Sequence, residues 1–242
     1  MQNPILIIGA SGTIGSAVAT KLADRGNPII LHGGSKSSRL QKLAEKLEAP
    51  CVYGDLSERE IAHRCAQEIN SITPKLSGLV FAAAKPFPHK LTLRTDWDIF
   101  QQQLNCQLKS LHLTLQNLKD SFVASEDGAR IVILSTEYVL GSPPIKIAPY
   151  IAAKAALTTY AQVLSQELLG SKIRIQILAP GLVKSALTAD MPDEYLEQLA
   201  ESMPEKKLTE PIEVAELCCF MMQPEADPLY GQIIQVSRGG RR

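Results

Sequence analysis

Short apolar runs alternate with longer segments of helical periodicity along the whole chain. The apolar runs have the length of β-strands and span residues 4–8, 29–32, 51–53, 78–82, 130–134, 173–178 and 233–236. The helical segments span residues 14–25, 38–47, 58–72, 96–124, 150–169 and 213–222, and the run Ser57-Glu58-Arg59-Glu60 predicts a capping box at one helix start. Fully apolar strands separated by amphipathic helices are typical of a parallel sheet covered on both faces. The pattern therefore predicts an α/β fold with a doubly wound sheet of seven parallel strands.

The chain reads as one domain over residues 1–242, because no internal repeat, low-complexity tract or linker divides it. Without a second domain, loops must hold the substrate. Two long loops follow later strands, at about residues 138–149 and 182–211. Both should leave the carboxyl ends of strands, where open α/β sheets bind ligands. The second contains a predicted short helix at residues 193–203 and is long enough to act as a lid.

Composition narrows the partners and the compartment. Twenty-five basic residues balance twenty-five acidic ones, so no net field draws the chain to nucleic acid or to an anionic membrane. The first apolar run is too short for a signal peptide or a membrane span, and we expect a cytoplasmic protein. The five cysteines form no C-x-x-C pair and none lies at metal-ligand spacing from a histidine, which predicts reduced, mostly buried thiols and no metal site. The basic tail from Arg238 to Arg242 is interpreted as a frayed terminus.

Tyr150 and Lys154 are the first candidates for chemistry. Their spacing of four residues on a helix places a phenol beside an ammonium group. A tyrosine with a pKa of about 10 is a poor acid at neutral pH, but a neighbouring cation favours the phenolate and lowers that pKa. The pair therefore predicts a general acid/base, although the same spacing also arises by chance on long helices.

A glycine-rich turn follows the first apolar run and opens the first predicted helix. Gly9 would permit the tight turn, while Gly12 and Gly15 would let the backbone approach a pyrophosphate at the helix N-terminus, where N–H groups and the helix dipole favour an anion. We therefore predict a dinucleotide site, and a turn that merely uses glycine is the alternative. The predicted contacts are Gly9, Ser11, Gly12, Thr13, Ile14 and Gly15.

Asp55 lies just beyond the third apolar run, in Tyr53-Gly54-Asp55-Leu56. Its carboxylate could accept a hydrogen bond from an adenine amino group. A loop aspartate near the start of the following helix is an equally good interpretation of the same residue.

Together these motifs resemble the short-chain dehydrogenase/reductase family, whose members are single Rossmann-like domains of about this length. The resemblance runs nearly from end to end and includes Lys207-Leu208-Thr209-Glu210-Pro211 before the last helix and Gly231 and Gly239-Gly240 around the closing strand. It implies that Tyr150 and Lys154 form the active-site pair and that Asn105 is the catalytic asparagine. It also implies that Asp55 contacts the adenine, and that relatives pair as homodimers or homotetramers through the helices at 96–124 and 150–169. Further cofactor contacts implied by the resemblance are Leu56, Ala82, Ala83, Pro180, Gly181 and Val183.

The chain departs from the family pattern at several positions. The glycines are spaced G-x-x-G-x-x-G, the Asn-Asn-Ala-Gly expected after the fourth strand reads Phe81-Ala82-Ala83-Ala84, and the closing strand carries an extra residue at Arg238. The family's catalytic serine would fall on Glu137 when counted from the tyrosine. Counted from the strand, Thr136 takes the serine's place, with Ser135 as the fallback. A carboxylate beside a developing oxyanion would oppose catalysis, so we expect Glu137 to turn away from the site.

The resemblance implies reversible hydride transfer between a nicotinamide and a carbonyl or alcohol. Tyr150 would protonate the substrate oxygen, Lys154 would lower the tyrosine pKa and hold the nicotinamide ribose, and Asn105 would order a water that joins Lys154 to solvent. Thr136 or Ser135 would hydrogen-bond the substrate oxygen. The substrate loops suggest an apolar pocket for a small-molecule carbonyl or alcohol, lined by Val139, Leu140, Ile145, Ile147, Leu182, Leu187 and Met191, and the general resemblance is to 3-oxoacyl-[acyl-carrier-protein] reductases and related carbonyl reductases.

The end of the second strand bears on the choice of cofactor. An acidic residue there would select NAD(H) by binding the ribose 2′-hydroxyl. The segment instead contains Gly34, Ser35 and Lys36, with no carboxylate before Arg39. We therefore predict a preference for NADP(H), with NAD(H) as the alternative. A nucleotide-binding regulator or pseudoenzyme of the same fold, and a structural partner that presents its long helices for assembly, are the alternatives to an enzyme.

Overall fold

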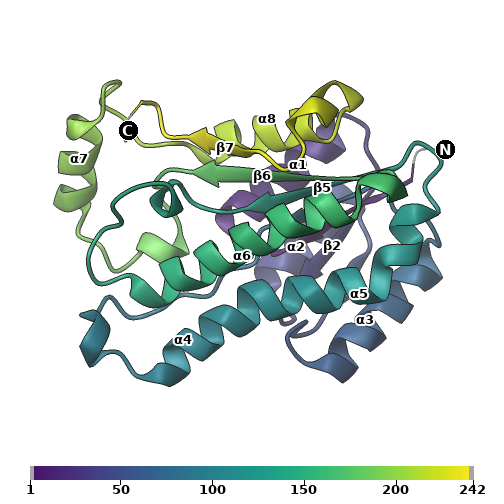
Figure 1. Ribbon diagram of the computed structural model, residues 1–242, viewed down its shortest axis with the longest axis horizontal. Coiled ribbons are helices and arrows are strands. Elements are labelled where there is room, and N and C mark those ends of the chain that lie inside the picture. The colour runs from purple at the N-terminus through teal and green to yellow at the C-terminus, as the bar shows by residue number, and fades with distance from the viewer. Residues whose placement is uncertain (1–2, 240–242) are drawn as a thin grey trace.

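Within residues 3–239, which the structure describes, seven parallel strands form one sheet in the order β3-β2-β1-β4-β5-β6-β7 (Figure 1). The structure is a computed structural model. All strand pairings are parallel, which confirms the predicted fold class. The strands are β1 Ile5–Ile8, β2 Ile29–Gly33, β3 Cys51–Tyr53, β4 Gly78–Phe81, β5 Ala129–Leu134, β6 Ile173–Pro180 and β7 Ile233–Val236.

The strand order reverses between β1 and β4. The chain builds β1, β2 and β3 outward to one edge, then returns to place β4 against the other side of β1 before it continues to β7. Ile8 at the end of β1 is therefore paired with Phe81 at the end of β4, and the chain leaves these two strands toward helices on opposite faces of the sheet. Such a switch point opens a crevice at the carboxyl ends of the strands, which is where ligands bind in this architecture.

Helices cover both faces of the sheet (Figure 1). On one face lie α1 Thr13–Asp24, α2 Ser38–Leu47 and α8 Pro211–Met221, and on the other lie α3 Arg59–Ile72, α5 Ser110–Val123 and α6 Ala148–Glu167. Pro211 suits the first turn of α8 because the N–H that proline lacks would have no partner inside the helix. In the loop after β6, α7 Asp193–Ser202 is the short helix predicted at residues 193–203, and a 3₁₀ turn, η5 Ala186–Thr188, precedes it.

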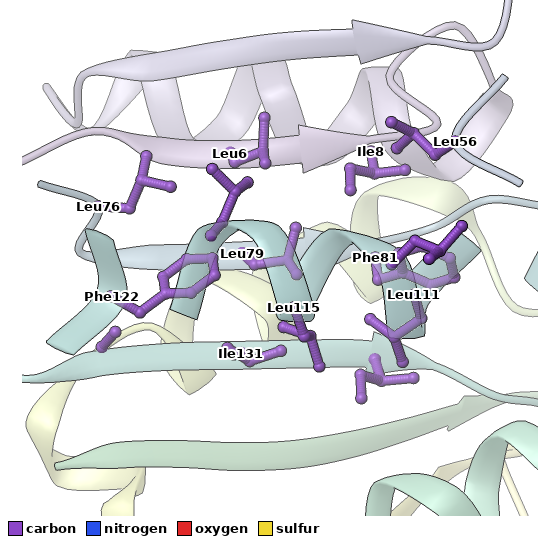
Figure 2. Close-up of a cluster of buried hydrophobic side chains, with 14 of the residues drawn as sticks. Leu6, Ile8, Leu56, Leu76, Leu79, Phe81, Leu111, Leu115, Phe122 and Ile131 are labelled. Carbon is purple, nitrogen blue, oxygen red and sulfur yellow. The ribbon is translucent and has the colours of Figure 1, made fainter. Parts of the chain in front are cut away.

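Alternate residues of each strand enter different cores. In β1, Leu6 and Ile8 pack into the core beneath α3, α5 and α6, whereas Ile5 and Ile7 pack against α1 and α8. Because both faces are buried, both positions of the alternation must be apolar. Figure 2 shows the first core, where side chains of β1, β4 and β5 meet Leu111, Leu115 and Phe122 of α5.

The long helix predicted at residues 96–124 is interrupted. It consists of α4 Trp97–Leu104, a π-helical turn at Asn105–Lys109, and α5. A π turn contains an extra residue, so it rotates every side chain that follows relative to a regular helix. Cys106 and Gln107 are buried in this turn, while Asn105 is half-buried.

The predicted capping box at Ser57 is wrong. Glu58 is the N-cap of α3, and it makes no side-chain capping hydrogen bond. The Ser57 hydroxyl donates instead to Asp55 Oδ1 at 2.7 Å, and the Ser57 N–H donates to the same oxygen at 3.0 Å. Asp55 therefore binds the Ser57 hydroxyl in place of the backbone N–H of α3 that a capping box would use. Aspartate and serine often form such local hydrogen bonds in turns. A capping box is present at α8, between Glu210 and Glu213.

The cysteines are free thiols, as predicted for a reduced protein. Among the described residues Cys65, Cys106, Cys218 and Cys219 are buried and Cys51 is half-buried. In the same part of the chain, no helix combines the length and apolar character needed to cross a membrane.

Candidate active site

Tyr150 and Lys154 lie in the first turns of α6, where the carboxyl end of β5 meets the helix. Lys154 is 3% exposed, and its Nζ donates to the Leu134 carbonyl oxygen at 2.5 Å. The same Nζ lies 5.7 Å from the centre of the Tyr150 ring. The last residue of β5 thus fixes the ammonium beside the phenol, and burial lowers the pKa of Lys154 to about 8.

Thr136 and Tyr150 line the same cavity. Burial raises the pKa of Tyr150, interaction with the Thr136 side chain opposes that rise, and the net pKa lies above the ordinary value. The expected lowering of the Tyr150 pKa by Lys154 is therefore not found in the protein by itself. The reason is that desolvation of the phenolate dominates and that the ammonium is directed at a backbone carbonyl.

Ser135 faces the helix rather than the phenol. Its hydroxyl is 2.5 Å from the Thr158 hydroxyl, which donates to the Lys154 carbonyl one turn earlier in α6. Ser135 therefore ties the end of β5 to α6. Of the two predicted donors, Thr136 is the one whose side chain influences the pKa of Tyr150, and its role toward the substrate oxygen stays a prediction.

Glu137 points into the protein beneath β6. Its side chain is 2% exposed, and a Cβ on Gly181 would come within 3.1 Å of Glu137 Oε1. The carboxylate thus occupies the space that a side chain at position 181 would need. It does not line the cavity that holds Tyr150, in agreement with the expectation that it turns away.

The glycine-rich turn has the geometry of a phosphate loop. Gly9 has a φ of +81°, and a Cβ on it would lie 2.7 Å from the Ala82 carbonyl oxygen. A Cβ on Gly15 would lie 2.2 Å from the Gly9 carbonyl oxygen. The folding of the loop itself therefore requires glycine at this position, whereas the sequence suggested that glycine was needed for the approach of a pyrophosphate. Gly12 is the exposed N-cap of α1 and brings no side chain that could cap the first N–H groups. These free donors suit an anion such as a pyrophosphate.

A cavity of about 190 Å³ joins the phosphate loop to Tyr150. With the N–H donors of α1 at one end and Tyr150 and Lys154 at the other, the cleft suits the pyrophosphate and reactive ring of a dinucleotide, with the ring beside the phenol. The predicted residues that line it are Gly12, Thr13, Ile14, Gly15, Ala82, Ser135, Thr136, Tyr150, Lys154, Pro180, Gly181 and Val183.

Other predicted cofactor residues lie outside this cavity. Gly9 and Ser11 belong to the loop behind it, Leu56 is buried in the core, and Ala83 packs against the same core. Gly34, Ser35 and Lys36 are exposed between β2 and α2. Among residues 3–239, no heavy atom comes within 4 Å of a Cβ placed on Gly34, so that position has room for a side chain.

Asp55 is held by neighbours within the protein. Its Oδ1 accepts both Ser57 donors, and its Oδ2 accepts from Lys85 Nζ at 3.0 Å. Burial would raise the pKa of Asp55, but the hydrogen bonds with Ser57 and Lys85 lower it overall. A carboxylate has about four lone-pair positions, so one more donor, such as an adenine amino group, can still be accommodated.

Asn105 is the first residue of the π turn. Its Oδ1 accepts from Gln101 Nε2 at 3.0 Å, and Asn105 does not line the cavity. Its link to Lys154 through a water therefore stays a prediction. Two buried amides near this turn bond toward the segment after β4: Gln107 Nε2 donates to Gln103 Oε1 at 2.9 Å, and Gln103 Nε2 donates to the Lys85 carbonyl at 3.1 Å.

The substrate end of the cavity differs in part from the expectation. Ile147, Leu182, Leu187 and Met191 line it, as predicted. Val139, Leu140 and Ile145 do not, and Leu140 and Ile145 are exposed because the loop before α6 carries them to the surface.

Phe87, His89 and Tyr138 line the cavity and were not predicted. The Phe87 ring stacks on the Tyr150 ring with centroids 5.4 Å apart and planes inclined by 10°. In the sequence, Pro86-Phe87-Pro88 reads only as a loop signal.

Arg238, the extra residue of the closing strand, follows β7 in the left-handed region with a φ of +48°. Its guanidinium forms ion pairs with Glu205, at the end of the loop that contains α7, and with Glu213 in α8. The extra residue therefore links the C-terminal segment to the base of this loop. Gly239 is described, whereas Gly240 of the predicted glycine pair lies outside the described residues.

The switch point, the phosphate loop and the Tyr-Lys pair together define a nucleotide-dependent oxidoreductase of the doubly wound class. Residues 9–240 match the protein family described as Enoyl-(Acyl carrier protein) reductase. The chain belongs to this family and, with it, to the short-chain dehydrogenase/reductases.

Relatives cover nearly the whole chain. It is 28% identical to an uncharacterized oxidoreductase, YmfI, of Bacillus subtilis over 99% of both chains. It is 26% identical to the 3-oxoacyl-[acyl-carrier-protein] reductase FabG of Aquifex aeolicus, over 97% of this chain and 95% of the relative. Among solved structures, the fold is shared with the Pseudomonas aeruginosa RhlG/NADP active-site complex, at a TM-score of 0.90 and 22% identity over 98% of this chain and 96% of the other. It is also shared with YwfH, an NADPH-dependent reductase involved in bacilysin biosynthesis, at a TM-score of 0.89 and 19% identity over 100% and 99% of the two chains.

Proposed function

We propose that this oxidoreductase interconverts a carbonyl and an alcohol by hydride transfer with NADP(H), and that Tyr150 is its general acid/base. The observation that carries the proposal is the position of Tyr150, beside Thr136 and Lys154, in a cavity that continues to the phosphate loop. One side of the cavity thus offers a proton donor and the other offers donors for a pyrophosphate.

In the reducing direction the substrate oxygen lies against the Tyr150 and Thr136 hydroxyls. The nicotinamide supplies a hydride to the carbonyl carbon when it is bound. Tyr150 gives its proton to the oxygen, and Thr136 stabilises the negative charge that develops there. Because burial raises the pKa of Tyr150, the phenol is protonated throughout the neutral range and is ready to act as an acid.

The positive charge of Lys154 stabilises the Tyr150 phenolate. Its ammonium is buried beside the phenol and bonded to the Leu134 carbonyl, so it favours a phenolate once the proton has left. With a pKa of about 8, Lys154 carries this charge at neutral pH and loses it in mild alkali. We assign it the nicotinamide ribose hydroxyls as additional partners.

NADP(H) is favoured by the residues after β2. The adenosine 2′-phosphate would lie against Gly34, Ser35 and Lys36, where the chain offers a hydroxyl and a cation and no carboxylate. Gly34→Asp tests this, because the position has room for a side chain and the new carboxylate would repel a phosphate. We expect NADPH to bind at least about tenfold more weakly, equivalent to ~1.4 kcal/mol, while NADH binding changes little. Gly34→Asn is the matched uncharged control, and an equal loss of both cofactors in the Asp variant would contradict the proposal.

The substrate class follows from the walls of the cavity. Leu182, Leu187 and Met191 provide apolar surface next to the reacting atoms, which suits a carbonyl compound with an apolar substituent. A 3-oxoacyl thioester or a related ketone has this character, and the FabG relatives support that class. We further assign a homodimer or homotetramer, built through the outer face of α4, α5 and α6, where Val163 is exposed.

The proposal is tested by NADPH oxidation with a panel of 3-oxoacyl thioesters and simple ketones, followed at 340 nm. We expect turnover that depends on Tyr150. The contrary result is that NADPH binds but is not consumed with any carbonyl, and that NADP+ is not reduced with the corresponding alcohols. The protein would then be a nucleotide-binding regulator rather than an enzyme.

A further inference from the structure

The segment between β4 and η1 Thr92–Arg94 crosses one side of the active-site cavity. It contains Pro86-Phe87-Pro88, in which each proline fixes its own backbone angle and restricts the residue before it to extended conformations. Lys85 and Phe87 both precede a proline. The backbone of this segment is therefore stiffer than that of an ordinary loop, and the Phe87 ring is held by its contacts with Tyr150 and His89.

The base of this segment is fastened to the body of the protein at Lys85. The Lys85 carbonyl accepts from Gln103, which is 1% exposed and is itself held by buried Gln107. The Lys85 ammonium pairs with Asp55 at 3.0 Å. A side-chain network thus anchors Lys85, two positions before Phe87. Lys85 directly follows the three alanines that replace the family's amide motif.

Phe87 forms a wall directly beside the reacting phenol. Its ring is nearly parallel to the Tyr150 ring, with centroids 5.4 Å apart, and His89 meets it edge-on at 5.1 Å. Leu187 and Met191 from the loop after β6 also line the cavity. A carbonyl whose oxygen reaches Tyr150 and Thr136 must therefore place its substituents next to the Phe87 ring.

We propose that Phe87 sets the width of the substituent that the substrate carries next to its carbonyl. The assignment rests on the proposed carbonyl chemistry and deepens it. The rigid ring admits a straight chain and excludes branching at the adjacent carbon, because a branch there would overlap a ring that the two prolines and the Lys85 anchor keep from moving. The substrate class is then a straight-chain, apolar ketone or 3-oxoacyl compound.

The test compares 2-octanone with its isomer 3-methyl-2-heptanone, which is branched next to the carbonyl. For the wild type we expect kcat/KM to favour 2-octanone by roughly tenfold or more, the usual scale for a methyl group in a tight apolar pocket. Phe87→Ala should reduce this preference to within about threefold, mainly through a lower KM for the branched ketone. Phe87→Leu, which keeps bulk but not the flat ring, should give an intermediate ratio. Phe100→Ala, which alters an aromatic pair on α4 outside the cavity, should leave the ratio unchanged.

A second measurement needs no turnover. Calorimetric titration of the NADP+ complex with the unreactive isomers pentanamide and pivalamide should show the same loss of discrimination in Phe87→Ala. Unchanged discrimination in this titration, or an equal change of kcat/KM for both ketones, overturns the assignment of Phe87. If the wild type binds the straight amide preferentially but reduces no ketone, the role of Phe87 in selecting the substituent is supported and the proposed carbonyl reduction is contradicted.

Discussion

The floor of the cavity and the loop that covers it are held by different kinds of polar contact. The floor uses buried hydrogen bonds, such as those of Lys154 to Leu134 and of Ser135 to Thr158. Apart from the pair of Arg238 with Glu205 at its base, the covering loop uses exposed ion pairs: Lys184 and Asp193 pair at 2.7 Å with side chains 71% and 74% exposed, and Lys206 pairs with Glu201 at 3.6 Å. Buried polar contacts are costly to break, whereas exposed pairs contribute little and weaken with salt.

This difference matches the work that each region has to do. Proton transfer requires atoms held within a few tenths of an ångström, which a dry, hydrogen-bonded floor provides. A loop that closes over a substrate has to open again, so weak contacts would suit such a role.

The largest effect is expected at Tyr150. Tyr150→Phe keeps the ring and its stack on Phe87 but removes the proton, so kcat should fall by about 10²–10⁴-fold while NADPH affinity stays within about twofold. Steady-state kinetics and a fluorescence titration of NADPH measure the two quantities. Tyr160→Phe, on the same helix outside the cavity, is the control. A kcat like that of the wild type would remove Tyr150 from the mechanism.

A buried histidine offers the next largest effect, on stability. His32 is 3% exposed, and burial lowers its pKa from 6.5 to about 4 while its Nε2 donates to the Gly54 carbonyl. Because the pKa of His32 is lower in the folded protein than in the unfolded chain, neutral His32 contributes fully to the free energy of unfolding above pH 6.5. This contribution is lost as the pH falls through 4. The loss should reach about 3 kcal/mol between pH 7 and pH 4.

Urea unfolding at both pH values measures this contribution. His32→Gln, which cannot take up the proton, should show a pH dependence smaller by about that amount. His63→Gln, at an exposed histidine of α3, should behave as the wild type does. An equal pH dependence in His32→Gln and the wild type would mean that His32 does not titrate as described.

Lys154 should give the reaction an alkaline limit. The pKa of Tyr150 is raised beyond the working range, so loss of the Lys154 charge near pH 8 should be the first titration to lower kcat/KM for reduction. We expect about a tenfold decrease per pH unit well above that pKa. In Lys154→Arg, whose charge persists, the residual activity should lack this limb. A wild-type profile that stays flat to pH 10 would contradict the assignment.

The smallest effect is expected in the covering loop. Lys184→Ala removes an exposed ion pair, so KM should change by no more than about twofold at 0.15 M salt and less at high salt. Lys206→Ala, in the same loop, is the matched comparison. A change in KM above tenfold would show that the exposed pairs control closure and that the contrast with the floor is wrong.

The sequence predicted the fold well because the relevant signals are local. Apolar runs located the strands, and the four-residue spacing placed Tyr150 and Lys154 side by side in α6. The strand order is set by pairings between distant segments, such as β1 with β4, and periodicity carries no information on such pairings.

The errors of prediction have physical causes that periodicity cannot reveal. The Ser57 hydroxyl donates to Asp55 and does not cap α3, because a local hydrogen bond to a neighbouring carboxylate competes with the capping bond. The helix predicted at residues 96–124 is interrupted by a π turn that begins at Asn105, and hydrophobic periodicity does not reveal a single extra residue. Phe87 could not be placed because its partner, Tyr150, lies 63 residues later and belongs to another element.

Arg238 has a practical consequence for handling the protein. The residue lies four positions from the C-terminal Arg242 and ties that end of the chain to Glu205 and Glu213, beside the loop that covers the site. The chain enters β1 at the opposite end of the sheet, because all strands run parallel toward the site. An affinity tag or fusion partner attached at the C-terminus would therefore pull on the loop that admits the substrate, whereas one attached before β1 would leave it undisturbed.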